Sequence, residues 1–192
     1  MPHALGLRGL IAAPFTPFHD DGSLALEGIP AYAAHLRRAG VRGVFVNGTT
    51  GEGCSLSGDE RRAAAEAWVD AAGRDLAMIV HVGANSLAEA AALAAHAEGI
   101  GAAAVGVLPP SFLKPRDAAM AAACLAEVAA ACPRTPVTYY HIPALSGVAL
   151  RAEDILAAAI DRVPNLGGLK FTHEDLHDFG RCIDRFGGVL DL

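Results

Sequence analysis

The stretch "PVTYYHIPALSGVALRAEDILAAAIDRVPNLGGLKFT" (136–172) holds one complete unit of the pattern that decides the fold. An apolar run at 136–142 is followed by an Ala-rich segment of helical periodicity at 151–162, and then by a second apolar run at 167–172. Short continuous apolar runs indicate strands buried on both faces. Two such strands joined through a helix indicate a parallel pair with a crossover connection.

The same alternation extends along the rest of the 192 residues. Further apolar runs lie at 9–15, 43–48, 77–83, 102–109 and 188–192, and helix-period segments lie at 24–39, 57–72, 86–99, 116–131 and 174–186. Ser57 and Ser86 each precede a glutamate by three residues, which predicts helix N-caps, and Gly40 predicts the end of the first helix. We expect one domain, residues 1–192, with six β/α units and a seventh strand.

Two architectures fit this alternation, an open doubly wound sheet and a (β/α)8 barrel. No G-x-G-x-x-G follows the first strand, which removes the usual sign of a dinucleotide-binding sheet. A complete barrel normally has about 250 residues, so a barrel would be truncated here after about six and a half units. In both architectures, ligands bind at the carboxyl ends of the strands.

Composition excludes several classes of partner. The chain is 53% hydrophobic with a net charge of −6, whereas nucleic-acid binding usually needs a clustered basic face. Its four cysteines form no C-x-x-C pair, which argues against a zinc ribbon or a disulfide framework and favours a reducing compartment. No signal peptide or membrane-spanning run is evident. We expect a soluble cytoplasmic protein with neither a nucleic-acid nor a membrane partner.

Lys170 is an anomaly within the apolar run "GGLKFT" (167–172). A lysine in such a strand must meet an opposite charge, extend its stem to solvent, or lose its proton. Desolvation lowers the pKa of a lysine and frees the amine as a nucleophile toward a carbonyl. A lysine that reaches solvent from the end of the strand explains the same sequence, so both interpretations stay open.

Two further strand ends carry polar groups. The second strand ends in "GTTGEG" (48–53), where the glycines let the backbone approach a ligand closely and Thr49 and Thr50 supply hydroxyls beside free amides. This combination suits the binding of a carboxylate. An ordinary Gly-rich turn without a ligand would have the same sequence. The fifth strand ends in "YYHIP" (139–143). Successive strand residues point to opposite faces, so only one of Tyr139 and Tyr140 can face a barrel interior and relay a proton.

The segment "HEDLH" (173–177) matches the H-E-x-x-H zinc pattern. It lies at the very start of an expected helix, where Glu174 and Asp175 suit the first turn as acids that favour the helix dipole. No third ligand candidate stands out downstream, so we expect no metal site there. The histidines at 35, 81, 96 and 141 have no ligand spacing and are interpreted as structural or surface residues.

The ordered set "APFTPF", "GTTGEG", "LPPSFLKP", "YYHIPALSGV" and "GLKFT" resembles the pyruvate-dependent class I aldolases of the dihydrodipicolinate synthase and N-acetylneuraminate lyase family. The resemblance runs from about Gly9 to the C-terminus. Within the family, His141-Ile142-Pro143 and "GLKFTHEDLHDFGRC" are most similar to the lyases of the animal type. Synthases typically show Asn-Val-Pro after the tyrosine. The resemblance implies a TIM (β/α)8 barrel.

The resemblance also implies roles. Lys170 would form a Schiff base with the keto carbon of pyruvate or of an open-chain sialic acid, and Tyr140 would move the proton. Thr49 and Thr50 would hold the pyruvate carboxylate, and Thr172 would lie near the cleaved bond. The implied reaction is reversible cleavage of N-acetylneuraminate to N-acetylmannosamine and pyruvate, without a metal or organic cofactor, by a homotetramer acting on a small-molecule keto acid or sugar acid.

Two departures from the family pattern keep alternatives open. Ser111 and Phe112 replace a tyrosine pair at the fourth strand, so that phenol relay is absent. The family's Gly-x-Asp-Glu segment, which binds sugar hydroxyls, would follow just after Leu192, which suggests a fragment. The remaining alternatives are an aldolase for another 2-keto acid, a dihydrodipicolinate synthase-like enzyme, and a non-catalytic truncated remnant.

Overall fold

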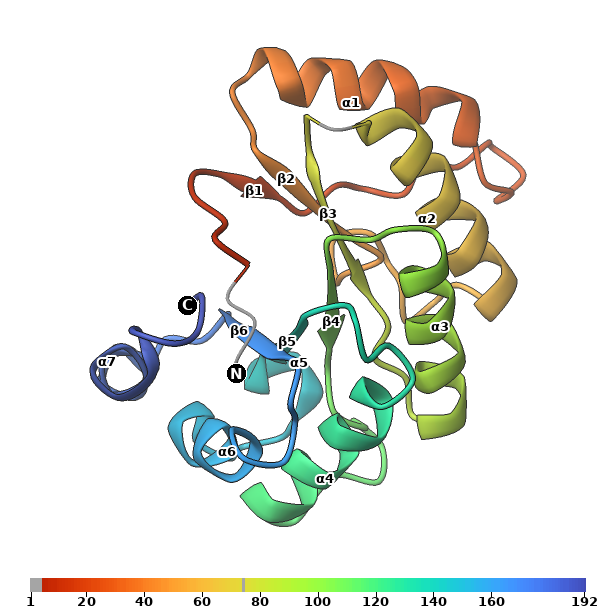
Figure 1. The fold of residues 1–192 in the computed structure, drawn as a ribbon. Helices are drawn as coiled ribbons and strands as arrows, with labels where there is room; N and C mark the ends of the chain where they lie inside the picture. Colours follow the sequence, from red (N-terminus) through yellow and green to blue (C-terminus); the bar gives the residue numbers. More distant parts are fainter. Residues whose placement is uncertain (1–4, 74) are drawn as a thin grey trace.

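The computed structural model describes residues 5–73 and 75–192, and its centre is a sheet of six parallel strands (Figure 1). The strands are β1 (Ile11–Ala12), β2 (Gly43–Val46), β3 (Ala77–His81), β4 (Ala104–Val107), β5 (Val137–His141) and β6 (Leu166–Phe171). Each strand pairs with the next along the chain, in the order β1-β2-β3-β4-β5-β6. That order lacks the reversal of a doubly wound sheet. The sheet curls into a half-barrel, so the barrel interpretation is confirmed.

Helices cover the outer face of the curled sheet (Figure 1). They are α1 (Ile29–Arg38), which the 3-10 turn η1 (Leu26–Gly28) precedes, α2 (Gly58–Ala72), α3 (Leu87–Gly99), α4 (Ala118–Ala129), α6 (Ala152–Ala159) and α7 (Leu176–Phe186). The short helix α5 (Pro143–Ser146) lies instead at the carboxyl end of β5. The predicted caps are confirmed. Ser57 forms a reciprocal capping box with Glu60, and Ser86 accepts from the amide of Glu89. Gly40 follows α1 with φ of 79°.

Three elements differ from the sequence-based expectation. The first strand is two residues long because it pairs on one side only and Pro14, just beyond it, has no N–H for the ladder. The predicted seventh strand is a single parallel bridge between Gly168 and Asp191. The short helix α5 was not predicted, although Pro143 at its first turn and left-handed Gly147 at its end are ordinary helix punctuation.

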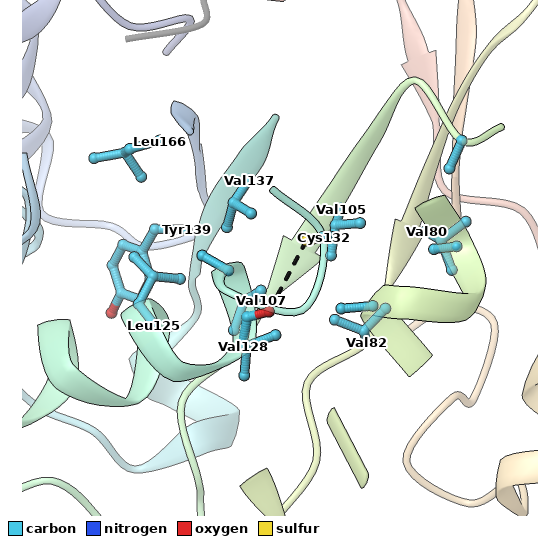
Figure 2. Close-up of a cluster of buried hydrophobic side chains, with 14 of the residues drawn as sticks. Val80, Val82, Val105, Val107, Leu125, Val128, Cys132, Val137, Tyr139 and Leu166 are labelled. Atoms are coloured by element: carbon cyan, nitrogen blue, oxygen red, sulfur yellow. Dashed lines mark hydrogen bonds between the residues drawn. The ribbon is translucent and has the colours of Figure 1, made fainter. Parts of the chain in front are cut away.

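The two faces of the sheet carry separate apolar clusters. On the outer face, Val105, Val107, Val137 and Tyr139 of the strands pack with Leu125 and other side chains of α4 (Figure 2). On the inner face a smaller cluster contains Phe45, Ile79, Ala104, Tyr140 and Ile142. Period-two alternation therefore sends Tyr139 into the helix layer and Tyr140 into the barrel interior. Only the latter can take part in a site at the barrel mouth.

Within the described residues, no helix combines the length and the apolarity that crossing a bilayer requires.

Candidate active site

Lys170 extends from β6 into the mouth of the half-barrel. It pairs in register with Tyr140 of β5, and its Nζ lies 3.9 Å from the centroid of the Tyr140 ring. The ring of Phe45 is the next aromatic neighbour, with its centroid 5.2 Å from Nζ. Nζ also donates to Thr172 Oγ1 at 3.0 Å. The amine thus lies half-buried against two aromatic rings, with a hydroxyl as its hydrogen-bond partner.

Tyr140 connects this lysine to the Gly-Thr turn after β2. Its hydroxyl lies 3.2 Å from Thr49 Oγ1, across 91 positions of sequence. The ring itself is only 3% exposed, which fixes the direction of the hydroxyl. Thr50 is the next residue of the same turn and is half-buried. The structure therefore joins Thr49, Tyr140, Lys170 and Thr172 in one series of contacts, while among the described residues no side chain bonds to the Thr50 hydroxyl.

The turn at 48–53 is built tightly from backbone hydrogen bonds. The amides of Glu52 and Gly53 donate to the carbonyls of Thr49 and Gly48, at 3.1 and 3.2 Å. The hydroxyl of Thr16 donates to the carbonyl of Gly51 at 2.6 Å. A Cβ on Gly53 would lie 1.9 Å from the carbonyl oxygen of Asn47, so only glycine fits there. Gly53 thus allows the turn to pack closely on the backbone of Asn47.

Phe45 and His81 form the floor under Tyr140, and the sequence did not single out either of them as part of the site. Their rings lie 5.3 and 5.7 Å from the Tyr140 ring, both edge-on. Burial lowers the pKa of His81 to about 3, with the positive charge of Arg61 adding to the effect, so the imidazole is neutral. The alternation of faces along a strand could have placed Phe45 inside the barrel. Alternation within one strand does not show which residues of neighbouring strands come into contact.

The zinc-like segment has another role. Asp175 is the N-cap of α7 and accepts from the amides of His177 and Asp178. His173 thus precedes the helix and cannot share a helix face with His177. In residues 5–73 and 75–192, no group of three or more His, Cys, Asp and Glu side chains is placed to hold a metal ion.

Two cavities flank the cluster. One, of about 300 Å³, lies inside the curl and is lined by Lys170, Phe45 and Thr138, among others. The other, of about 320 Å³, lies beside the Gly-Thr turn and is lined by Thr49, Ile142 and their neighbours. A small molecule bound at Lys170 therefore has room in the cavity inside the curl.

Consecutive parallel strands, outer helices and a polar cluster at the carboxyl ends of β2, β5 and β6 define a protein of the (β/α)-barrel class. The profile of the dihydrodipicolinate synthetase family matches residues 6–187, and the chain belongs to that family.

Its relatives narrow this assignment. N-acetylneuraminate lyase of Pongo abelii is 50% identical over 182 residues, and the match covers 93% of this chain and 57% of the relative. The Homo sapiens lyase is 49% identical over the same shares of both chains. The structure of Proteus mirabilis N-acetylneuraminate lyase superposes with a TM-score of 0.93 at 42% identity, covering 96% of this chain and 62% of that one. The chain thus spans a little over half the length of its curated relatives.

Proposed function

We propose that the protein is a class I aldolase that reversibly cleaves N-acetylneuraminate to N-acetylmannosamine and pyruvate. The observation that carries the proposal is the position of Lys170, whose Nζ lies against the Tyr140 ring and bonds to Thr172 while the Tyr140 hydroxyl meets Thr49. The substrate follows from the names of the Pongo abelii and Homo sapiens relatives.

The first step is attack of the Lys170 amine on the keto carbon of the open-chain sugar acid. The carbonyl oxygen leaves as water, and a protonated imine forms between Nζ and that carbon. The nearby hydroxyl of Thr172, 3.0 Å from Nζ, orients the amine before attack. The turn containing Thr49 and Thr50 offers hydroxyls and amides to the adjacent carboxylate, which fixes the position of the keto carbon.

The second step breaks the carbon–carbon bond. The Tyr140 oxygen takes the proton of the substrate hydroxyl while its own phenolic proton passes to the substrate carboxylate, and the hydroxyl carbon becomes the aldehyde of N-acetylmannosamine. The electron pair of the broken bond moves into the protonated imine, giving a neutral enamine. The same proton returns along this route to the enamine carbon. Protonation of the enamine carbon and addition of water then release pyruvate and free the amine. The protonated imine is the electron sink, so the scheme requires no metal or organic cofactor.

The surroundings of the reaction are part of the same proposal. We place the enzyme in the cytoplasm and assign it a homotetrameric assembly, as the family resemblance implies. Exposed Phe112 and Leu113, 81% and 82% accessible, lie on the loop after β4 and supply apolar surface for contact between subunits.

The test is reductive trapping with pyruvate and borohydride. Lys114 is the chain's other lysine, which makes it an internal control. We expect a stable adduct on Lys170, with the mass of pyruvate less water plus two hydrogens, and no adduct on Lys114 in peptide mapping. Lys114→Ala should trap pyruvate normally, and Lys170→Ala should not. A folded chain that stays unmodified, or is modified at Lys114, would overturn the assignment. Comparing turnover of N-acetylneuraminate with that of other keto-deoxy acids then tests the substrate.

A further inference from the structure

Three buried side chains form a closed ring of hydrogen bonds beneath the Gly-Thr turn. Arg61 Nη2 donates to the carbonyl of His81 at 2.9 Å. His81 Nδ1 lies 2.9 Å from the carbonyl of Asn47, and Asn47 Nδ2 donates to the carbonyl of Arg61 at 2.9 Å. All three residues are at most 3% exposed. The ring joins the end of β2, the end of β3 and the first turn of α2.

The ring holds a strained backbone. Asn47 has φ of 58°, in the left-handed region that residues with a Cβ seldom adopt, although asparagine does so more readily than most. It immediately precedes the turn at 48–53, so its conformation sets the direction in which Thr49 and Thr50 leave the strand. Its carbonyl is fixed from two sides, by His81 and by the close approach of Gly53. Strain of this kind persists only where the surrounding structure over-determines it.

The chemistry of the contact fixes the tautomer of His81. A carbonyl only accepts, so Nδ1 must carry the proton that it donates to Asn47. Nε2 is then a buried lone pair, and it has no partner among the described residues. A second proton at Nε2 would put a positive charge into the interior beside Arg61, with Lys170 contributing further repulsion. The ring of hydrogen bonds therefore holds the His81 imidazole neutral and in a single tautomer.

We propose that His81 and Arg61 are positioning residues that hold Asn47 in its left-handed conformation and thereby fix Thr49 and Thr50 for the keto-acid carboxylate. This inference rests on the proposed function, since it assigns the ring a role in binding pyruvate. Neither residue touches the reacting atoms. A ring that served stability alone would be expected to leave the binding of pyruvate unchanged in any variant that still folds.

The test compares two replacements of His81, one that keeps an N–H donor and one that removes it. His81→Asn keeps an amide N–H near the place of Nδ1, and His81→Leu removes the donor. With His81→Leu we expect the KM for pyruvate in aldol condensation to rise about tenfold or more, the usual effect of one lost buried hydrogen bond. We expect the KM for the aldehyde to stay near its original value. His81→Asn should recover most of the pyruvate affinity, and His35→Gln on the exposed face of α1 is the matched control.

A second readout is independent of catalysis. Amide hydrogen exchange across residues 48–53 should accelerate in His81→Leu and in Arg61→Met, while the amides of α4 stay protected. Loss of pyruvate trapping by the unaltered chain would refute the proposed function but leave the exchange result interpretable. Conversely, normal trapping combined with unchanged pyruvate KM and unchanged exchange in both variants would refute the role of the ring alone. If His81→Leu fails to fold, His81→Asn and Arg61→Met carry the comparison.

Discussion

The free energy of unfolding of this protein should fall steeply as the pH drops from 7 to 5, because two buried histidines, His81 and His141, stay neutral in the folded state. Burial lowers the pKa of His81 from 6.5 to about 3 and that of His141 from 6.5 to about 4. In the unfolded chain both groups titrate near 6.5. Below that pH the unfolded state binds more protons than the folded state, so acid favours unfolding.

The magnitude follows from those two shifts. Each imidazole contributes a slope of about 1.4 kcal/mol per pH unit once the pH is well below 6.5. When this slope is integrated from pH 7 to pH 5, each histidine lowers the free energy of unfolding by about 2 kcal/mol, and the two together lower it by about 4 kcal/mol. A typical domain has only about 5–15 kcal/mol of stability, so the effect is large. For His141, the nearby carboxylates of Asp178 and Asp175 oppose the shift and His173 adds to it.

Urea denaturation at several pH values measures this slope directly. His81→Gln and His141→Gln should each remove about half of the loss between pH 7 and pH 5, whatever they do to absolute stability, because each deletes one titrating group. His35→Gln, at an exposed position of α1, is the control for replacing a histidine by glutamine. A free energy of unfolding that stays flat from pH 7 to pH 5 would refute the reasoning, and so would single variants that retain the slope of the unaltered chain.

Three further perturbations have defined outcomes. Tyr140→Phe removes the hydroxyl at Thr49, so turnover should fall about 10²- to 10⁴-fold while borohydride still traps pyruvate on Lys170; loss of trapping would contradict a proton-relay role. Gly53→Ala places a methyl group against the Asn47 carbonyl and should raise the pyruvate concentration needed for half-maximal trapping, with unchanged affinity as the contrary result. Ser57→Ala deletes the capping box of α2 and should cost about 1 kcal/mol in urea denaturation, without effect on trapping.

In the part of the chain that the structure describes, the alternation of apolar runs and helix-period segments predicted every strand of the sheet and six of the seven α-helices. Both periods are visible in the sequence because each element buries apolar side chains in the same core. The weak points were at the sheet edges. Strand β1 and the bridge at Asp191 pair too little to extend as far as their apolar sequence suggests. Propensity cannot report whether a neighbouring strand is present to complete a ladder.

Only part of the candidate site could be predicted from the sequence. Lys170 stood out because an ionisable group in an apolar run is conspicuous, and the Gly-Thr turn stood out through its glycines. Phe45 and the hydrogen-bond ring through His81 did not. Nothing local marks a histidine whose partner, Asn47, is 34 positions away, or a phenylalanine whose ring packs against Tyr140 of another strand. The choice between Tyr139 and Tyr140 likewise depended on which face of β5 meets the interior, a property of the assembled sheet.

The opposite directions of Tyr139 and Tyr140 limit how β5 can change. Inserting or deleting a single residue upstream within this strand would slip its register and exchange the two faces. Tyr140 would then enter the helix layer. The side chain paired with Lys170 would be His141 after a deletion and Tyr139 after an insertion. We therefore expect insertions and deletions to be tolerated in the connections on either side of β5. Within β5 the number of residues is fixed, because any single-residue change exchanges the side chains that face the site and the helices.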